Sequence, residues 1–517
     1  MNVARFISFW TGFCSLSLEI AWVRLYGYAN SSTPQAFAYV LMVYLLGIAA
    51  GAQMGKNICL FPERRKIEGA AVIALAISAV IAVIAPWAFF YSQSFVIDDV
   101  VAPLAIFMTA ASLSVLFPIT HHLGTPEKST NNALGKGQSF SRVYALNVAG
   151  AALGPLVTGY VLLDYFTITQ IFPFLGMVVA FVALMAWLMY GRRVGSAALG
   201  SVAFSLLLSL WVLHESRLES TALARSFALV GDRKVVASHE SRHGIITIAE
   251  EGVAKLNGEL FVDHGVYGGN VYDGKVNVDL ERNTNGLERP LALHVLQPDA
   301  KRVLVLGLSI GSWLTIVEGF PGVETIDVVE INPGYLDLAQ RYDAQKSALS
   351  DSRVNMVIDD ARRWLQYHPE KKYDLILMNT TWHWRANSSM LLSQEMMQLV
   401  NRHLSPKGIV AFNATGSIDA FFTASSVFKE VRRYQNFIYG ANWNPFERTL
   451  KEDNWNLLKA VTVNGKPGFR ENSNTIQKFS KIPFVRLESD LKTLGREPEV
   501  ITDDNMLVEY KYGRKNK

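Results

Sequence analysis

The feature that most constrains this chain is a series of seven apolar stretches, each long enough to cross a bilayer as a helix. They cover residues 6–28, 36–55, 69–91, 101–120, 143–163, 166–190 and 196–213. A spanning helix needs about 20 mainly apolar residues. Of the 517 residues, 50% are hydrophobic and only 18% are charged, and the excess of hydrophobic residues lies before residue 213. We therefore predict an α-helical multi-span membrane domain over residues 1–213.

Charges between the stretches indicate an orientation. Lysines and arginines follow the second, fourth and sixth stretches, whereas acids follow the third and fifth. Because basic loops stay in the cytoplasm, the N-terminus is predicted to be cytoplasmic. Seven crossings would then place the C-terminal half outside the cytoplasm. If residues 196–213 lie only at the interface, that half stays inside, and both alternatives remain open. The first stretch has no small-residue cleavage site, which is typical of an anchor and not of a removed signal peptide.

Glu19, Arg24 and Asn147 are polar residues within the apolar stretches. An intramembrane carboxylate is often functional, so Glu19 is a candidate site residue, together with Asn147. Alternatively, Glu19 and Arg24 lie near a span end and contact other helices. Glycines at four-residue spacing predict close helix packing. These glycines are Gly47, Gly51, Gly55, Gly150 and Gly154.

Composition also excludes several function classes. The two cysteines, Cys14 and Cys59, cannot build a disulfide framework or a cysteine metal site. The net charge of +4 comes without a basic stripe of interleaved aromatic residues, so we expect no nucleic-acid partner. We also expect no metal ion.

The composition becomes ordinary after residue 213. Residues 214–233 are predicted to be a charged linker, and residues 234–295 a small antiparallel β-domain with a connecting helix, in which Asn257-Gly258 is a hairpin signal. In residues 296–465, apolar runs alternate with amphipathic segments, which is typical of βαβ units and a parallel sheet. Residues 466–517 form a polar, weakly periodic extension to which the sequence assigns no role.

The first core strand, at residues 303–306, leads into a glycine turn. Gly307, Ser309 and Gly311 belong to this turn, and a helix follows it. Ligands of parallel α/β sheets bind at the carboxyl ends of the strands. Glycines let the backbone approach a ligand there, and a helix N-terminus favours an anionic group. The pattern by itself is common and weakly specific.

Acids at the next two strand ends make the pattern more specific. Glu330 ends the second strand, about twenty residues after the glycine turn, where an acid can bind both hydroxyls of a ribose. Asp360, followed by Ala361, ends the third strand and is placed to accept from an adenine amine. We therefore predict a nucleoside ligand. The alternative is that Glu330 and Asp360 only cap the helices that follow them.

Several motifs in this half resemble those of the spermidine/spermine synthase family, in the membrane-fused form found in bacteria. The motifs are Val303-Leu-Val-Leu-Gly-Leu-Ser-Ile-Gly-Ser, Val329-Glu-Ile-Asn-Pro, Asp359-Asp-Ala-Arg, Tyr373-Asp-Leu-Ile-Leu and Leu392-Ser-Gln-Glu. The membrane half contributes Ser15-Leu-Ser-Leu-Glu-Ile-Ala-Trp-Val-Arg and Val143-Tyr-Ala-Leu-Asn-Val-Ala-Gly to the resemblance.

The resemblance implies a class I methyltransferase-type Rossmann fold preceded by a small antiparallel β-domain. It also implies S-adenosylmethionine or its decarboxylated form as a substrate, a small-molecule amine as acceptor, and a homodimer. The protein would then be a multi-pass protein of the bacterial inner membrane with its C-terminal half in the cytoplasm, although charge counting with seven spans would place that half outside.

Two departures from the family fall on catalytic positions. The family has an Asp in its glycine loop, where this chain has Ile310, and an Asp after the fourth strand, where this chain has Asn379. The Tyr-His pair that usually precedes the core has no clear counterpart. An attacking amine must lose a proton, and an Asn can orient a substrate but cannot accept that proton near neutrality.

The segment after Asn379 offers substitutes. His383 ordinarily titrates near neutral pH and could act as the base, while Trp382 and Trp384 could stack on adenine or enclose a cation. Arg385 could bind a carboxylate, which would suit a substrate unlike putrescine. The alternative is a lid loop whose tryptophans pack on the protein, with His383 idle.

Three functions follow from these observations. The first is a membrane-anchored transferase that moves an aminopropyl or methyl group to an amine, with Asn379 and His383 at the acceptor. The second is a catalytically degenerate domain that regulates or scaffolds the membrane half. The third is a transporter of polyamine-like cargo, although the spans show no repeated half or pair of broken helices.

Overall fold

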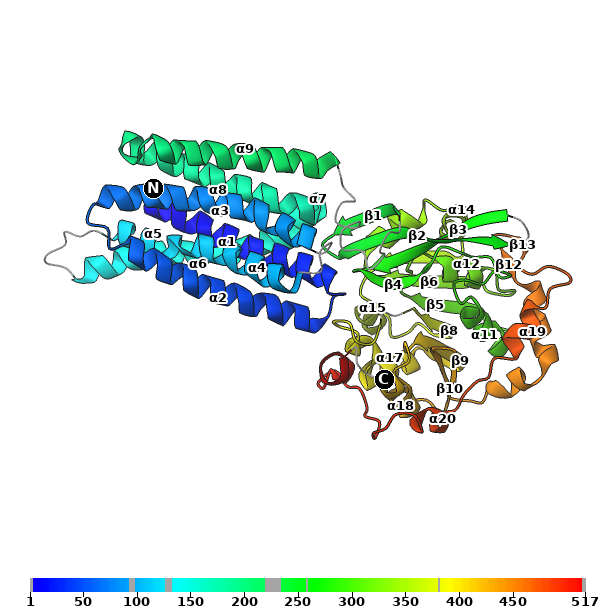
Figure 1. The fold of residues 1–517 in the computed structure, drawn as a ribbon. Coiled ribbons are helices and arrows are strands. Elements are labelled where there is room, and N and C mark those ends of the chain that lie inside the picture. Colours follow the sequence, from blue (N-terminus) through cyan, green and yellow to red (C-terminus); the bar gives the residue numbers. More distant parts are fainter. Residues whose placement is uncertain are drawn as a thin grey trace. The chain divides into compact units, whose positions relative to one another are not determined.

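The chain forms two compact units (Figure 1). The computed structural model describes residues 3–92, 98–125, 133–218, 234–256, 259–379 and 382–513. The first unit comprises Met1–Asp232 with Glu240–Ile245, and the second comprises Arg233–His239 with Ile246–Lys517. Most of the predicted linker, as well as Asn257, Gly258, Thr380 and Thr381, lies outside the described residues.

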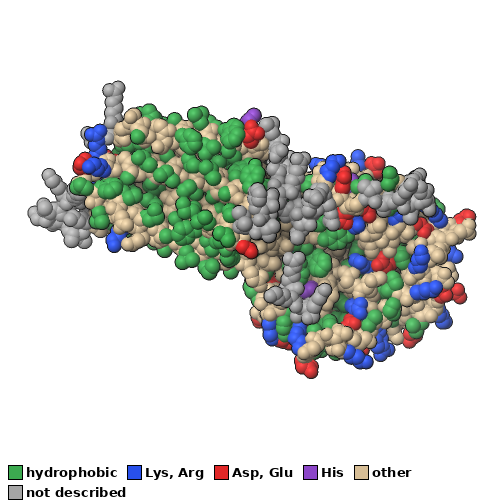
Figure 2. All heavy atoms as spheres, in the orientation of Figure 1, with side chains coloured by type: hydrophobic (Ala, Val, Ile, Leu, Met, Phe, Trp, Pro, Cys, Tyr) green, Lys and Arg blue, Asp and Glu red, His purple; other side chains and the backbone are tan. Residues whose placement is uncertain are grey.

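The first unit is helical. Its helices are α1 (Val3–Ala29), α2 (Pro34–Ile58), α3 (Arg64–Ser92), α4 (Asp98–Ser114), α5 (Leu116–Gly124), α6 (Ala133–Val157), α7 (Leu163–Tyr165), α8 (Ile168–Tyr190) and α9 (Ser196–Leu218). In the described chain they supply seven helical segments long and apolar enough to cross a membrane, and each overlaps one of the predicted stretches over most of its length. Hydrophobic side chains cover much of the face of this unit that Figure 2 shows. The predicted multi-span helical architecture is confirmed at this level.

The seventh segment, Ser196–Ser216, has a mean hydropathy of 1.9 over 21 residues. It belongs to α9, which packs against α8 and α3 within the bundle. By length, hydropathy and packing it resembles the other six segments. Whether it crosses the membrane or lies at the interface stays a prediction, as does the side on which the C-terminal half lies.

The spaced glycines lie at close helix contacts, as predicted. A side chain at Gly51 would meet the carbonyl oxygen of Ala111 at 2.1 Å, and one at Gly150 would meet that of Phe9 at 2.0 Å. Asn147 Nδ2 donates to the carbonyl of Ser8 at 2.9 Å and joins α6 to α1. Asn147 therefore has a structural bond, whereas Glu19 is partly buried on α1 and its functional role stays a prediction.

The second unit begins with a four-stranded antiparallel sheet. Its strands are β1 (Val235–Ser241), β2 (Gly244–Leu256), β3 (Glu259–Gly268) and β4 (Val271–Lys275), in that order. Helix α11 (Glu288–Leu296) connects this sheet to the core. The small antiparallel β-domain is therefore confirmed.

A seven-stranded sheet forms the core of the unit, in the order β7-β6-β5-β8-β9-β11-β10. Its strands are β5 (Arg302–Leu306), β6 (Thr325–Glu330), β7 (Val354–Ile358), β8 (Tyr373–Met378), β9 (Leu404–Asn413), β10 (Glu430–Tyr434) and β11 (Phe437–Ala441). The first five in this spatial order are parallel, whereas β11 pairs antiparallel to β9 and to β10.

Helices flank this core. They are α12 (Ser312–Glu318), α13 (Pro333–Ala339), α14 (Asp343–Leu349), α15 (Ala361–Tyr367), α16 (Ser389–Leu392), α17 (Gln394–Arg402) and α18 (Ile418–Ser425). Along β5, Val303 and Val305 join the hydrophobic cluster on one face of the sheet, and Leu304 and Leu306 join the cluster on the other. Both faces are buried, which explains why the strand reads as a continuous apolar run. The predicted Rossmann-like α/β core is confirmed.

The C-terminal extension is packed onto the core. It contains β13 (Lys466–Pro467), paired with β12 (Thr462–Val463), and the helices α19 (Thr475–Ser480) and α20 (Leu487–Leu491). Ile501, Leu507 and Val508 are buried in the core cluster. The Glu509 carboxylate accepts from the backbone N–H groups of Asn387, at 2.8 Å, and Ser389, at 2.7 Å. The extension therefore fixes the end of the loop that follows β8.

Candidate functional site

The glycine turn after β5 has a backbone that only glycine adopts without strain. Gly307 and Gly311 have φ angles of 87° and 84°. A Cβ atom on Gly307 would lie 2.6 Å from the carbonyl oxygen of Asn379. Ser309, between the two glycines, also has a positive φ of 50°, and its Oγ donates to the carbonyl of Asp273 at 2.9 Å. The turn is therefore held tightly between β8 and the β-domain.

Glu330 lies directly beside this turn. Its carboxylate accepts from the backbone N–H of Leu308 at 2.7 Å and from that of Asn332 at 2.8 Å. Burial raises the pKa of Glu330 to about 7, although these backbone donors act in the opposite direction and the Asp273 charge adds to the rise. The cap of α13 is Asn332, whose side chain accepts from Gly334 at 3.0 Å. Glu330 is therefore not the cap that the alternative prediction assumed.

Asp360 does act as a helix cap. Its side chain accepts from the backbone N–H of Arg363 at 2.8 Å, and Ala361 is the first residue of α15. Asp360 is exposed, so its second carboxylate oxygen remains open to solvent. Asp360 therefore caps α15, as the alternative prediction assumed, and its exposed carboxylate can also accept a hydrogen bond from a ligand.

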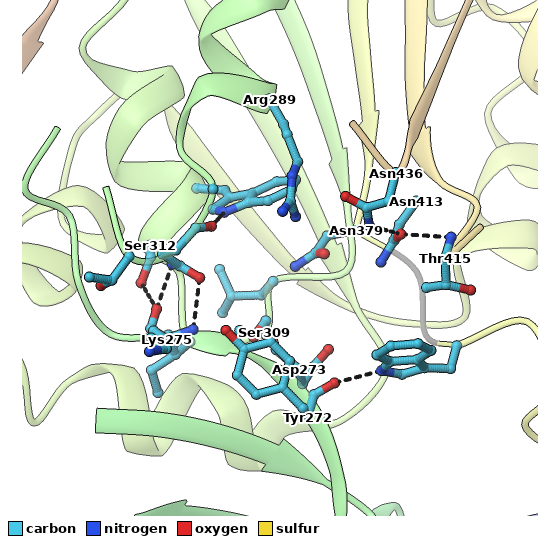
Figure 3. A pocket seen from close by; sticks show the side chains of 18 of the residues that line it. Tyr272, Asp273, Lys275, Arg289, Ser309, Ser312, Asn379, Asn413, Thr415 and Asn436 are labelled. Carbon is cyan, nitrogen blue, oxygen red and sulfur yellow. Dashed lines mark hydrogen bonds between the residues drawn. The ribbon is translucent and has the colours of Figure 1, made fainter. Parts of the chain in front are cut away.

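A cavity of about 410 Å³ lies on the side of the turn that faces the β-domain (Figure 3). Its lining residues come from the β4 segment, α11, the glycine turn, β8 and the end of β9. They are Tyr272, Asp273, Gly274, Lys275, Thr284, Asn285, Gly286, Arg289, Leu308, Ser309, Ile310, Ser312, Trp313, Asn379, Trp382, Asn413, Thr415, Gly416 and Asn436. The lining is rich in amides, since four asparagines contribute to it.

Asp273 is the carboxylate of this lining among the described residues. Tyr335 Oη donates to its Oδ2 at 2.6 Å. Burial raises the pKa of Asp273, and the hydrogen bond from Tyr335 and the charge of Arg385 partly offset this rise. The charge of Asp273 in turn raises the pKa of Glu330, so the two carboxylates interact. A buried carboxylate of raised pKa is a better proton acceptor than an exposed one.

Of the residues predicted from the sequence, Ser309, Ile310, Asn379 and Trp382 line the cavity. Ile310 is 1% exposed and joins a hydrophobic cluster with Ala237 and other β-domain residues. The position that holds an Asp in the family therefore provides packing in this chain. In the described structure, the other predicted residues do not line the cavity. They are Gly307, Gly311, Glu330, Asp360, Ala361, His383, Trp384 and Arg385.

The loop after Asn379 is largely packed. His383 is 6% exposed, its Nδ1 lies 2.7 Å from Thr415 Oγ1, and burial lowers its pKa to about 4. Trp384 is buried, and Trp382 Nε1 donates to the carbonyl of Tyr272 at 2.9 Å. The tryptophan rings lie 6.1 Å apart at 39°. This arrangement favours the packed-loop alternative, and a catalytic role for His383 stays a prediction.

Arg385 also lies away from the cavity lining. Its charge interacts with Asp273 and Tyr335 beneath the glycine turn, and burial lowers its pKa. Among the described residues, no cluster of three His, Cys, Asp or Glu side chains is placed to hold a metal ion.

Sequence reasoning missed the charged residues of the cavity. Asp273, Lys275 and Arg289 all lie before the core, in segments that carry no recognised motif. Tyr272-Asp273-Gly274 gave a weak signal, because Asp-Gly is a turn dipeptide close to the expected site. Nothing in the local sequence of Arg289 distinguishes it from a surface arginine.

Comparison with known proteins supports the resemblance. A family model for the spermine/spermidine synthase domain matches residues 290–440. The chain is 23% identical over 418 residues to the polyamine aminopropyltransferase of Mycobacterium tuberculosis, which covers 78% of this chain and 75% of that protein. It is 27% identical over 204 residues to the enzyme of the same name from Saccharolobus solfataricus, which covers 38% of this chain and 64% of that protein. Because fewer than 418 residues follow α9, the first match extends into the helical unit.

The solved structures that resemble this chain include spermidine synthase from Thermotoga maritima. It has a TM-score of 0.38 and 18% identity, and the match covers 51% of this chain and 88% of that one. A spermidine synthase in complex with the transition-state analogue AdoDATO gives a TM-score of 0.39 with the same identity and coverage.

Proposed function

We propose that the chain, whose residues 290–440 match the family model for the spermine/spermidine synthase domain, is a membrane-anchored transferase. It would bind S-adenosylmethionine or its decarboxylated form and transfer an aminopropyl or methyl group to an amine. One observation carries this proposal. The Glu330 carboxylate is held beside the glycine turn, at the strand end where an acid binds a ribose.

Glu330 would accept from the two ribose hydroxyls, and Asp360 would accept from the adenine amine. Both carboxylates lie at the carboxyl edge of the parallel sheet, at the ends of the neighbouring strands β6 and β7. The glycine turn at Gly307–Gly311 brings the backbone close to the ligand. These three elements bind the nucleoside and leave its sulfonium-bearing tail directed to the cavity.

The cavity would hold the acceptor. Its amine nitrogen attacks the carbon bonded to the sulfonium, the carbon–sulfur bond breaks, and the uncharged thioether leaves. The proton lost by the amine needs an acceptor, and we assign that role to Asp273, since it lines the cavity and its pKa is raised by burial. Asn379 would orient the amine, and His383 would position Thr415.

A second candidate function has a specific observation in its favour. Ile310, at a position where the family has an acid, is part of a hydrophobic cluster, and His383, expected at the acceptor, is buried with a lowered pKa, so neither carries a charge at neutral pH. A synthase-like domain that regulates or scaffolds the helical unit would fit this. Binding and transfer assays separate the two functions, because a scaffold has no turnover.

Membrane anchoring is supported by the seven apolar helical segments, and a homodimer is implied by the resemblance alone. The side of the membrane is decisive, because the nucleoside donor is cytoplasmic. A reporter fused after Lys517 tests this. Reporter activity on the cytoplasmic face is the result expected for a transferase. Reporter activity only on the outer face would exclude the transferase function.

Calorimetry tests the nucleoside site. We expect saturable binding of S-adenosylmethionine, its decarboxylated form or methylthioadenosine to the full-length protein in detergent. Glu330→Ala should weaken this binding by roughly a hundredfold, since it removes charge-assisted bonds worth about 1.5–3 kcal/mol each. Glu324→Ala is the matched control, because Glu324 is exposed and pairs with Lys301. Equal affinity in both variants would refute the ribose assignment.

A further inference from the structure

The charge of the cavity does not suit a polycation. Asp273, Lys275 and Arg289 are the charged side chains that line it in the described structure. A site for a diamine or longer polyamine needs more than one carboxylate to balance the ammonium groups. Here the lining carries two cations, one acid and four amides.

Two of the three charges already have partners. Lys275 Nζ lies 2.9 Å from Glu251 Oε2 and 3.5 Å from Asp263 Oδ2. Asp273 is bonded to Tyr335, and its charge interacts with that of Arg385. These two lining charges are therefore largely compensated from outside the cavity, whereas Arg289 has a longer ion pair, with its Nε 3.7 Å from Glu288 Oε1.

The guanidinium of Arg289 is held in place by packing. It lies 5.9 Å from the ring centroid of Trp313 and 5.7 Å from that of Phe437, and a side chain on Gly286 would meet it at 2.6 Å. Tyr439 Oη donates to the Arg289 carbonyl at 2.7 Å, which fixes the start of α11. Arg289 faces Ser309 and Asp273 across the cavity (Figure 3).

The Nε–H of this guanidinium makes no hydrogen bond to the described residues. Its Nε is buried and has no hydrogen-bond acceptor there. The nearest carboxylate, Glu288 Oε1, lies 3.7 Å from Nε, beyond hydrogen-bonding distance, and the other Glu288 oxygen accepts from Asn283 at 2.6 Å. The planar guanidinium of an arginine, with its parallel N–H donors, is suited to bidentate binding of a carboxylate.

We propose that Arg289 binds a carboxylate of the ligand, so that this cavity selects an amino acid group over its decarboxylated amine. The inference rests on the proposed function and defines the substrate class of that site. It also gives a reason for Ile310, because an acid at that position would face the cavity and repel a carboxylate.

The carboxylate has two possible sources. It belongs either to the donor, as in S-adenosylmethionine, or to the acceptor, as in an amino acid with a side-chain amine. Two pairs of compounds differ only by a carboxylate and separate these sources: S-adenosylmethionine with decarboxylated S-adenosylmethionine, and ornithine with putrescine.

Calorimetry of the full-length protein provides the test. The donor pair is titrated directly, and the acceptor pair is titrated in the presence of saturating methylthioadenosine. We expect the carboxylate-bearing member of at least one pair to bind at least tenfold more tightly. Arg289→Gln should abolish that preference while leaving methylthioadenosine affinity unchanged, which also shows that the variant is folded. Arg302→Gln is the control, because Arg302 begins β5 at the opposite edge of the sheet and pairs with Asp374.

Each outcome is informative. A preference in the donor pair assigns the carboxylate to the nucleoside, and one in the acceptor pair assigns it to the amine. Equal affinities within both pairs, or a preference that survives in Arg289→Gln, would overturn the inference while methylthioadenosine binding still supports the proposed function. Failure of methylthioadenosine to bind would overturn both.

Discussion

Two neighbouring parts of the second unit differ in how closely they follow the family pattern. The proposed nucleoside edge, made of the glycine turn, Glu330 and Asp360, keeps the glycines and acids of the family pattern. The transfer cavity beside it has Ile310 and Asn379 at the family's acidic positions, together with Arg289. Under the proposed function, separate residues therefore recognise the nucleoside and the acceptor, so one group can change while the other is retained.

Among these substitutions, we expect Gly307→Ala to cause the largest loss of ligand affinity at the nucleoside edge. Its Cβ would lie 2.6 Å from the Asn379 carbonyl, and φ is 87°, so the turn that carries the Leu308 N–H must shift. We expect methylthioadenosine affinity to fall by at least about a hundredfold. Gly322→Ala is the control, because Gly322 has a φ of 83° but no atom within 4 Å of the added Cβ. Both variants carry a backbone strain of roughly 1–2 kcal/mol, and only the first should lose the ligand.

The substitution Asn379→Asp tests the transfer cavity. It places a carboxylate in the cavity at the family's position, so an ammonium-bearing acceptor gains a counter-charge and a second base. Aminopropyl transfer from decarboxylated S-adenosylmethionine to putrescine should rise about tenfold, as followed by spermidine formation. The matched substitution Asn436→Asp adds the same charge at another lining position. An equal gain there would show that Asn379 has no special place in the transfer.

The affinity of the nucleoside edge should depend on pH. Because burial raises the pKa of Glu330 to about 7, the free protein binds a proton there as the pH falls below 7. Ribose hydroxyls donate to the charged form, so protons compete with the ligand. Methylthioadenosine affinity should therefore decrease by up to about tenfold per unit below pH 7 and level off above it. Calorimetry at pH 5.5 to 8.5 checks this, and a Glu330→Gln variant should show a flat profile.

Glu509→Gln should have the smallest effect. The substitution replaces a carboxylate by a neutral amide and so weakens the hydrogen bonds accepted from the backbone N–H groups of Asn387 and Ser389. We expect this to lower the local stability of the loop after β8 by about 1–2 kcal/mol. Hydrogen exchange of this loop should become roughly ten times faster. The control is Glu499→Gln, since Glu499 is only partly buried and accepts from Lys511 in the same extension. Equal exchange in the two variants would contradict the anchoring role.

Much of the fold follows from periodicity. The apolar stretches predicted the seven segments, and the continuous apolar run of β5 predicted a buried strand because both of its faces are covered. Glu330 and the glycine turn were found because strand ends meet at one edge of a parallel sheet. The capping role of Asp360 could not be separated from ligand binding, since both use an acid at the same position.

The transfer cavity could not be predicted in the same way. Asp273 and Arg289 reach it only because the β-domain packs on the glycine turn, where Ser309 bonds the Asp273 carbonyl and Ser312 bonds the Lys275 carbonyl at 2.7 Å. Such contacts join segments more than 30 residues apart and produce no periodic pattern in the sequence. The C-terminal extension was missed for a related reason, because single residues such as Ile501 fill gaps in a core built by other segments.

The most direct test of the account is a titration of methylthioadenosine into the unmodified full-length protein at pH 8. This compound carries the nucleoside but no aminopropyl group or carboxylate, so it reports on the nucleoside edge alone. We predict saturable binding with one site per chain, weakened about a hundredfold in Glu330→Ala and unchanged in Arg289→Gln. Absence of binding at millimolar ligand, or equal binding in Glu330→Ala, would contradict it.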